Sequence, residues 1–167
     1  SDRIKENIYV GPSFSDEQIR TFLDDNNILY AILNDETVLQ KTAKLISEGN
    51  VLGWYQGRME WGPRALGNRS ILADPRDEKM KDILNEKIKH RESFRPFAPS
   101  ILEEYVSDYF DIEIPSPYML HVTNVKQPEK IPAVTHVDGT GRLQTVSKDV
   151  NPLYYNLISE FQKISGV

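Results

Sequence analysis

The sequence predicts a single α+β domain. The first observation is the length of 167 residues, which suits one compact domain. The second is the composition, because 39% hydrophobic residues supply enough apolar material for a core. The third is the order of the elements: helix-like and strand-like segments are mixed without regular βαβ alternation, which favours α+β over a doubly wound sheet.

The N-terminal part begins with a predicted helix over about 16–26. Ser15 followed by Gln18 has the spacing of a capping box, and the apolar residues that follow fall on one helical face. Residues 29–33 (LYAIL) are short and apolar, so they favour either a strand or a continuation of the helix.

A second helix is predicted over about 36–48, with Gly49 as its C-terminal stop. Residues 51–56 (VLGWYQ) then indicate a buried strand. Residues 57–70 have three glycines, one proline and three arginines without either regular period, which is typical of an ordered loop.

The remaining elements are two helices and three strands. One helix is expected over about 77–90, with acidic residues first and basic residues last, as the helix dipole favours. The other begins with Asn151 as N-cap and Pro152 at the first helical position. The strand-like runs are YMLHV (118–122), AVTHV (133–137) and LQTV (143–146), and together they predict a sheet.

Composition excludes several classes of protein. The chain has no cysteine, so disulfides, thiolate metal sites and a cysteine nucleophile are ruled out. No apolar run approaches the ~18 residues of a membrane span, and the first residues do not resemble a secretion signal. We therefore expect a cytoplasmic protein.

Charge is distributed unevenly along the chain. The formal net charge is −5, but residues 54–100 carry ten Lys/Arg against seven Asp/Glu. The middle of the chain is therefore an electropositive segment. A single-stranded RNA binder that stacks bases on aromatic and arginine side chains is disfavoured, because the total charge is negative and no basic patch lies outside this segment.

The glycine-rich loop is the first candidate site. Arg58, Arg64 and Arg69 are spaced six and five residues apart in it. Guanidinium groups bind phosphate or carboxylate bidentately, so a convergence of several would suit a polyphosphate or an acyl phosphate. The alternative is a set of surface arginines that pair with the nearby carboxylates, which are Glu60, Asp74 and Asp77. No G-x-x-x-x-G-K-[ST] sequence occurs, so P-loop chemistry is not indicated.

The second candidate is the polar segment THVDGTGR (135–142). It combines His136, Asp138, two glycines and Arg142, and it suits an anion or substrate loop. The alternative is a hairpin turn in which the Asp-Gly pair supplies the left-handed residue. His136 and Asp138 are too few for a metal site, so no tightly bound metal is expected.

Four motifs carry a resemblance to a known family. The sequence resembles the C-terminal domain of the ATP-dependent O-carbamoyltransferases of nodulation-factor and antibiotic tailoring, from about residue 7 to residue 167. The motifs are GWYQGRMEWGPRALGNRSILADPR (53–76), FRPFAPSIL (94–102), SPYML (116–120) and IPAVTHVDGTGRLQTV (131–146). The resemblance implies a YrdC-like α+β domain, with a mixed twisted sheet flanked by helices, over residues 1–167. It also implies an excised domain, truncated at both ends relative to the full-length enzyme.

The resemblance assigns roles to matching positions. It implies that Arg58, Arg64, Arg69 and His136 are catalytic, and that the nucleotide and carbamoyl phosphate are bound by Asn68, Ser70, Arg95, Thr135, Asp138 and Gly139. The family usually has Ala where Gly141 stands and Phe or Trp where Tyr55 stands, and both changes are mild.

The implied function is formation of carbamoyl adenylate from carbamoyl phosphate and ATP, with Mg²⁺ on the nucleotide. A separate N-terminal Kae1-like domain of the same enzyme would then pass the carbamoyl group to an acceptor hydroxyl, and a homodimer is possible. A different class of function also stays open, a non-catalytic nucleotide- or anion-binding module that docks on a partner domain. Neither the acceptor nor the oligomeric state can be predicted from the sequence.

Overall fold

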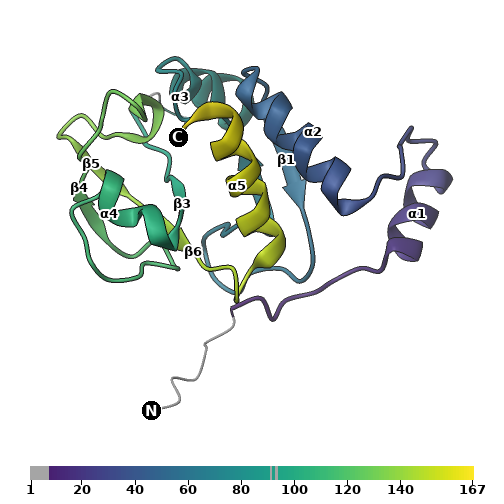
Figure 1. The fold of residues 1–167 in the computed structure, drawn as a ribbon. Helices are drawn as coiled ribbons and strands as arrows, with labels where there is room; N and C mark the ends of the chain where they lie inside the picture. Colours follow the sequence, from purple (N-terminus) through teal and green to yellow (C-terminus); the bar gives the residue numbers. More distant parts are fainter. Residues whose placement is uncertain (1–7, 91, 93) are drawn as a thin grey trace, which may run out of the picture.

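The computed structural model describes residues 8–90, 92 and 94–167 (Figure 1). Its α-helices are α1 (Asp16–Asp25), α2 (Asp35–Ser47), α3 (Met80–Ile83), α4 (Val106–Tyr109) and α5 (Pro152–Ser165). Its strands are β1 (Leu52–Tyr55), β2 (Arg69–Leu72), β3 (Ser100–Leu102), β4 (Val122–Asn124), β5 (Thr140–Arg142) and β6 (Gln144–Val146). Within these residues, no helix is long and apolar enough to cross a membrane.

The strands form three two-stranded sheets, which confirms the α+β class. β1 pairs with β2 and β4 pairs with β5, both antiparallel, whereas β3 pairs with β6 in parallel. The expected mixed sheet is thus present as three separate pieces among the described residues. The parallel pair joins residues 100–102 to residues 144–146, so it brings together segments that are far apart in the sequence.

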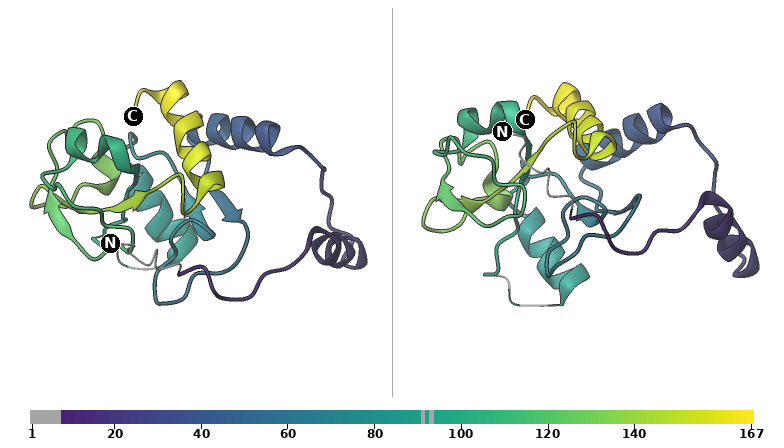
Figure 2. Two further views of the ribbon diagram at one scale, coloured as in Figure 1. Left: turned by 60° about the horizontal axis from the view of Figure 1, so that its bottom comes forward. Right: turned by 90° about the horizontal axis from the view of Figure 1, so that it is seen from below.

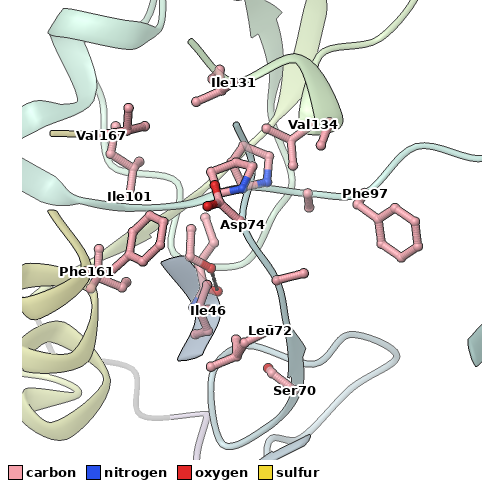
Figure 3. Close-up of a pocket in the computed structure, with 18 of the residues that line it drawn as sticks. Ile46, Ser70, Leu72, Asp74, Phe97, Ile101, Ile131, Val134, Phe161 and Val167 are labelled. Carbon is pink, nitrogen blue, oxygen red and sulfur yellow. Dashed lines mark hydrogen bonds between the residues drawn. The ribbon is translucent and has the colours of Figure 1, made fainter. Parts of the chain in front are cut away.

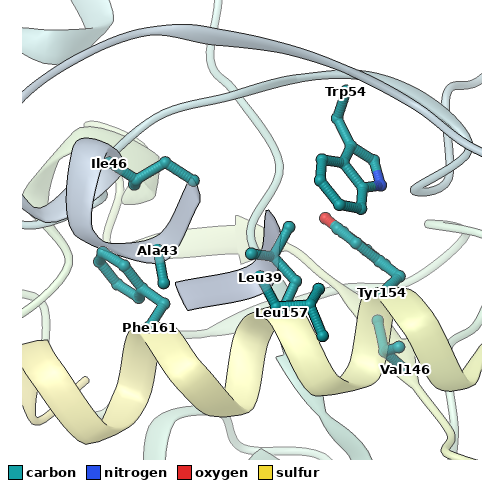
Figure 4. Packing of buried hydrophobic residues seen from close by; sticks show 8 residues of the cluster. All are labelled: Leu39, Ala43, Ile46, Trp54, Val146, Tyr154, Leu157 and Phe161. Carbon is teal, nitrogen blue, oxygen red and sulfur yellow. The ribbon is translucent and has the colours of Figure 1, made fainter. Parts of the chain in front are cut away.

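The largest hydrophobic cluster lies where α2 and α5 pack against each other beside β1 (Figure 4). Ala43 is completely buried and lets the two helices approach closely, and Leu157 and Phe161 of α5 lie in the same cluster. A second cluster surrounds Phe110 and Leu143 on the other side of β3 and β6. The two clusters support the glycine-rich loop and the THVDGT segment.

α1 stands apart from these clusters. Figures 1 and 2 show it projecting from the rest of the structure on extended segments, and none of its residues is buried. Its predicted capping box is confirmed, because Ser15 and Gln18 bond reciprocally. Residues 29–33, for which a strand or continued helix was expected, form neither.

Other element predictions are confirmed. α2 ends before Gly49, whose φ of +85° is the left-handed stop that was expected. Asn151 caps α5 through the N–H of Tyr154, and Pro152 begins that helix. β1 and β6 lie within predicted strands, although only Trp54 of β1 is buried.

The predictions for 118–122 and 133–137 were largely wrong. Met119 has a φ of +53°, which interrupts a strand, so β4 begins only at Val122. Pro132–Val134 form a 3₁₀ turn instead of a strand. The helix predicted over 77–90 begins at Met80, because the Asp77 carboxylate first accepts the N–H of Lys79 in a turn. It continues as a π-helical turn, Leu84–Lys89.

Candidate functional site

Glu60 organises the glycine-rich loop. One oxygen of its carboxylate accepts the N–H groups of Leu66, Asn68 and Arg69 at 2.8, 2.7 and 3.2 Å. Hydrogen bonds to a charged acceptor are stronger than neutral ones, so this single carboxylate holds the loop in one conformation. Glu60 therefore does not neutralise an arginine, as the alternative interpretation of the sequence required.

Arg58 and Arg69 also hold the loop in place. Arg58 donates to the carbonyl oxygens of Gly11 and Val10 at 3.0 and 2.5 Å. These bonds hold residues 10 and 11 against the glycine-rich loop. Arg69 donates to the carbonyls of residues 56, 57 and 68, and its guanidinium stacks 3.5 Å from the ring centroid of Tyr55. Within the described residues, neither arginine pairs with a carboxylate.

Asn68 connects the loop to the helix layer. Its amide donates to the Arg58 carbonyl at 2.7 Å and accepts from Gln56 and Asn151 at 3.0 and 2.9 Å. Asn68 is 5% exposed, so this network is buried. Since Asn151 also caps α5, the loop and that helix are held in a fixed relation.

Ser70 and Arg95, which were also expected to bind the nucleotide, have other partners. The Ser70 hydroxyl accepts the N–H of Gly67 at 3.0 Å. Arg95 is exposed and forms an ion pair with Glu92 at 2.8 Å. No hydrogen bond or ion pair of the described chain links Arg95 to the glycine-rich loop. The other nearby carboxylates are also occupied, because Asp74 pairs with Arg76 at 2.6 Å and Asp77 closes its own turn.

The THVDGT segment is a tight turn closed by its own side chains. One oxygen of Asp138 accepts both the N–H and the hydroxyl of Thr140, at 3.0 and 2.7 Å. These bonds lower the pKa of Asp138 below its usual value. Gly139 has a φ of +79°, so the left-handed residue expected in this turn is present. Thr135 donates to the Ile131 carbonyl at 2.9 Å.

The same turn determines the tautomer of His136. Nδ1 of His136 lies 3.0 Å from the Thr140 hydroxyl oxygen. Because that hydroxyl donates its only proton to Asp138, its oxygen must accept from Nδ1–H. Nε2 of the neutral imidazole is then left with a free lone pair. This atom is buried and has no hydrogen-bond partner among the residues that the structure describes.

Arg142 is the residue that the sequence analysis placed in the motif without giving it a role. Its Nε is also buried, and no described residue is its hydrogen-bond partner. Burial lowers the pKa of Arg142, and the positive charge of nearby Arg64 lowers that pKa further. A buried donor without a partner, in the positive field of a second arginine, is a place that an anion would stabilise. No spacing in the sequence could have shown that Arg64 acts on Arg142.

Comparisons with known proteins agree with this arrangement of motifs. A family model described as Carbamoyltransferase C-terminus matches residues 43–167. Nodulation protein NolNO of Sinorhizobium fredii is 45% identical over 99% of the chain and 25% of its own length. Nodulation protein NolO of Bradyrhizobium diazoefficiens is 45% identical over 93% and 30%. A 3'-hydroxymethylcephem-O-carbamoyltransferase of Amycolatopsis lactamdurans is 45% identical over 73% and 23%. The chain thus spans less than a third of the length of these relatives.

Proposed function

The chain belongs to the carbamoyltransferase C-terminus family, and on that premise we propose that it binds ATP and carbamoyl phosphate and forms carbamoyl adenylate. The observation that carries the proposal is a pair of buried nitrogens on one segment, His136 Nε2 and Arg142 Nε, which have no hydrogen-bond partner among the described residues. Buried polar atoms in folded proteins nearly always have hydrogen-bond partners, so two such atoms on one segment support a ligand at this place.

The positive charges of Arg64 and Arg142 would stabilise the negative charge that develops on the phosphoryl oxygens. Water first cleaves the P–O bond of carbamoyl phosphate, which releases phosphate and leaves carbamate. A carbamate oxygen then attacks the α-phosphorus of ATP, and the bond to pyrophosphate breaks. Both steps gather negative charge on phosphoryl oxygens, so fixed guanidinium groups and the Mg²⁺ of the nucleotide stabilise them.

His136 can bind the carbamoyl group through a hydrogen bond. Its Nε2 lone pair can accept a hydrogen bond, and the carbamoyl NH₂ is a donor. Asp138 and Thr140 orient the imidazole by fixing the proton on Nδ1. Thr135 and Gly139 shape the same turn. In this assignment His136 and Arg142 touch the substrate, and Asp138 is a positioning residue.

Four other predicted residues have supporting roles in the proposal. Arg58, Arg69 and Asn68 keep the glycine-rich loop in position, as their bonds to backbone carbonyls require. Ser70 supports the loop through Gly67. Arg95 is exposed, so it would reach a phosphate only by leaving Glu92.

The acceptor step belongs to another part of the enzyme. The chain spans 23–30% of the length of the relatives cited above, so most of such an enzyme lies outside it. We assign transfer of the carbamoyl group to an N-terminal Kae1-like domain, and we place the enzyme in the cytoplasm, where ATP and carbamoyl phosphate are made. The isolated chain is then expected to yield no carbamoylated acceptor. Any product formed by the purified chain alone would contradict this division of labour.

The test is carbamoyl phosphate-dependent exchange of pyrophosphate into ATP by the full-length enzyme. Arg142→Lys and Arg64→Lys each remove a bidentate, charge-assisted pair worth about 1.5–3 kcal/mol, so exchange should fall about 10- to 150-fold. The matched control is Arg20→Lys on exposed α1, which should leave exchange unchanged.

Two results would contradict the proposal. Normal exchange in both variants would show that the arginines do not bind the phosphates. Nucleotide binding by the wild-type enzyme without any exchange would favour the alternative, an anion-binding module without chemistry.

A further inference from the structure

Residues 8–12 form a strap that lies along the glycine-rich loop, and none of them was predicted to take part in the candidate site. The strap and the loop run in opposite directions. The N–H of Trp61 donates to the Ile8 carbonyl at 2.8 Å, and the N–H of Gly11 donates to the Met59 carbonyl at 3.0 Å. These backbone bonds fix the strap and the loop in one register.

The side chain of Tyr9 extends this contact to the part of the loop that follows Arg64. Its hydroxyl donates to the Leu66 carbonyl at 2.8 Å, and the Gln144 amide donates to the same carbonyl at 2.9 Å. A carbonyl oxygen has two lone pairs, so these two donors satisfy it. The N–H of Leu66 donates to Glu60 at 2.8 Å. Both backbone groups of this buried residue are therefore fixed, and the strap supplies one of the bonds.

Packing constrains the loop incompletely, because two of its residues border a cavity. Ala65 and Ser70 line an apolar cavity of about 320 Å³, together with helix residues such as Ile46 and Phe161 (Figure 3). Atoms that face a cavity have dispersion partners on one side only. The position of Arg64 therefore depends on the hydrogen bonds that hold the loop, including those from the strap.

Gly11 sets how closely the strap approaches the loop. A Cβ atom at this position would lie 2.8 Å from the Cβ of Met59 and 3.0 Å from its carbonyl oxygen. The second contact is to backbone, which cannot rotate away as the end of a flexible side chain can. The same close approach brings the Gly11 and Val10 carbonyls within reach of Arg58. Alanine at residue 11 would therefore separate the strap from the loop without removing a hydrogen-bonding atom.

We propose that the strap is part of the substrate site, with Tyr9 as a positioning residue that keeps the glycine-rich loop, and with it Arg64, in the conformation that binds phosphate groups. The inference rests on the proposed function, because that function makes Arg64 a ligand of the substrate phosphates. Tyr9 touches no substrate in this assignment and acts through the Leu66 carbonyl. Phenylalanine has the same ring but no hydroxyl donor, so Tyr9→Phe removes this action alone.

Amide hydrogen–deuterium exchange in the full-length enzyme tests the position of the loop without any substrate. The probes are the amides of residues 66, 68 and 69, which donate to Glu60. Tyr9→Phe should make these amides exchange about 3- to 10-fold faster, the range that one lost hydrogen bond predicts. Gly11→Ala should change them in the same direction. The amides of α2 and α5 should exchange as in the wild type.

The matched control is Tyr30→Phe. It also removes one tyrosine hydroxyl, which donates to Asp24 at 3.0 Å on the exposed surface. Because neither residue contacts the glycine-rich loop through this bond, Tyr30→Phe should leave both the loop amides and the enzyme kinetics unchanged.

Steady-state kinetics of pyrophosphate exchange into ATP then connect the loop to binding. Tyr9→Phe should raise the KM for ATP or for carbamoyl phosphate by about 3- to 10-fold and should change kcat by less than about 2-fold, as loss of uniform binding does. A merely structural role would lower the concentration of folded enzyme, which lowers the apparent kcat and leaves KM unchanged.

The strap and the proposed function fail in different ways. Unchanged loop amides in both Tyr9→Phe and Gly11→Ala would overturn the strap proposal, and so would faster loop amides with an unchanged KM. A wild-type enzyme that exchanges no pyrophosphate would contradict the proposed function instead. In that case, weaker binding of inorganic pyrophosphate by Tyr9→Phe than by the wild type would still support the strap, and equal binding would overturn it.

Discussion

Gly67 and Gly139 both have left-handed backbones, but only one of them is also crowded. Gly67 has a φ of +104°, and a side chain there would run into the ring of buried Tyr154. Gly139 has a φ of +79° with open space around it. The two positions therefore separate backbone strain from steric overlap.

Alanine substitutions at these two positions should lower the free energy of unfolding by different amounts. Gly139→Ala should lower the free energy of unfolding by about 1–2 kcal/mol, through the left-handed backbone alone. Gly139→Val should cost more than Gly139→Ala, because a β-branched side chain is disfavoured further in a left-handed backbone. Gly67→Ala should cost about 1–3 kcal/mol more than Gly139→Ala, because the Tyr154 ring must move. Urea denaturation measures all three, and equal losses at the two glycines would contradict the assignment.

Ionisation of Tyr154 should lower the stability of the folded protein at high pH. It is buried and donates to the Ser100 hydroxyl at 2.9 Å, and burial raises its pKa from 10.0 to about 12. A raised pKa means that the unfolded state loses the proton first. The contribution of neutral Tyr154 to the free energy of unfolding is therefore fully present below about pH 10, and it is lost as the pH rises from about 10 to 12.

The expected loss approaches ~2.7 kcal/mol at pH 12, because each pKa unit corresponds to about 1.4 kcal/mol. Denaturation measured from pH 9 to 12 should show a shallower decline in Tyr154→Phe than in the wild type. Other tyrosines titrate in the same window, so the difference between the two proteins is the quantity to compare. Parallel curves would mean that Tyr154 ionises as readily in the folded state as in the unfolded one.

At the level of elements, the α2–α5 contact contains the largest hydrophobic cluster of the described residues. Leu157 of α5 is 2% exposed in the cluster that this contact forms, whereas Leu45 of α2 is 41% exposed. Leu157→Ala should lower the free energy of unfolding by about 2–5 kcal/mol, since it opens a cavity between the helices. Leu45→Ala removes the same atoms from the surface and should change stability by less than about 0.5 kcal/mol. A similar loss in both variants would show that the contact contributes little.

The strands depend more than the helices on contacts between segments that are far apart in the sequence. Each strand has three or four residues, too few for a stable pair by itself, and the β3–β6 pair depends on segments more than forty residues apart. Gln144 reinforces this pair, because its side chain accepts from Ser100 and donates to the Leu66 carbonyl. The sheet pieces therefore depend on the tertiary packing that holds these segments together.

At the scale of the whole molecule, the segment around α1 is an exposed apolar surface. Leu29 is 100% exposed, Ile32 is 69% exposed and Phe22 is 61% exposed. Isolated apolar residues are common on surfaces, but several in one projecting segment indicate a contact surface. The isolated chain is therefore expected to self-associate through residues 22–33.

Sedimentation velocity over a range of concentrations tests this expectation. The variant Leu29→Glu/Ile32→Glu should reduce association and leave the unfolding free energy within about 0.5 kcal/mol, because neither side chain is buried. The control is Ile114→Glu, an exposed residue outside this segment, which should associate as the wild type does. Unchanged association of the double variant would place the contact elsewhere.

Features that depend on neighbouring residues could be predicted from the amino-acid sequence. Ser15 and Gln18 are three positions apart and cap α1, and Asn151 bonds the N–H of Tyr154 at the start of α5. The left-handed Gly139 was predictable for the same reason, since a tight turn imposes its backbone angles locally. The motifs of the glycine-rich loop and of THVDGT were likewise enough to identify the family.

What each charged group contacts became visible only in the folded chain. Arg58 and Arg69 are bound to backbone carbonyls, Glu60 is bound to backbone amides, and the buried Nε of Arg142 has no partner among the described residues. The strand predicted at 118–122 was largely wrong because buried Met119 adopts a left-handed backbone that no periodicity reveals. The physical reason is common to these cases. The covalent structure of a side chain sets which bonds it can form, whereas the folded chain sets which partners come within the roughly 3 Å that a hydrogen bond requires.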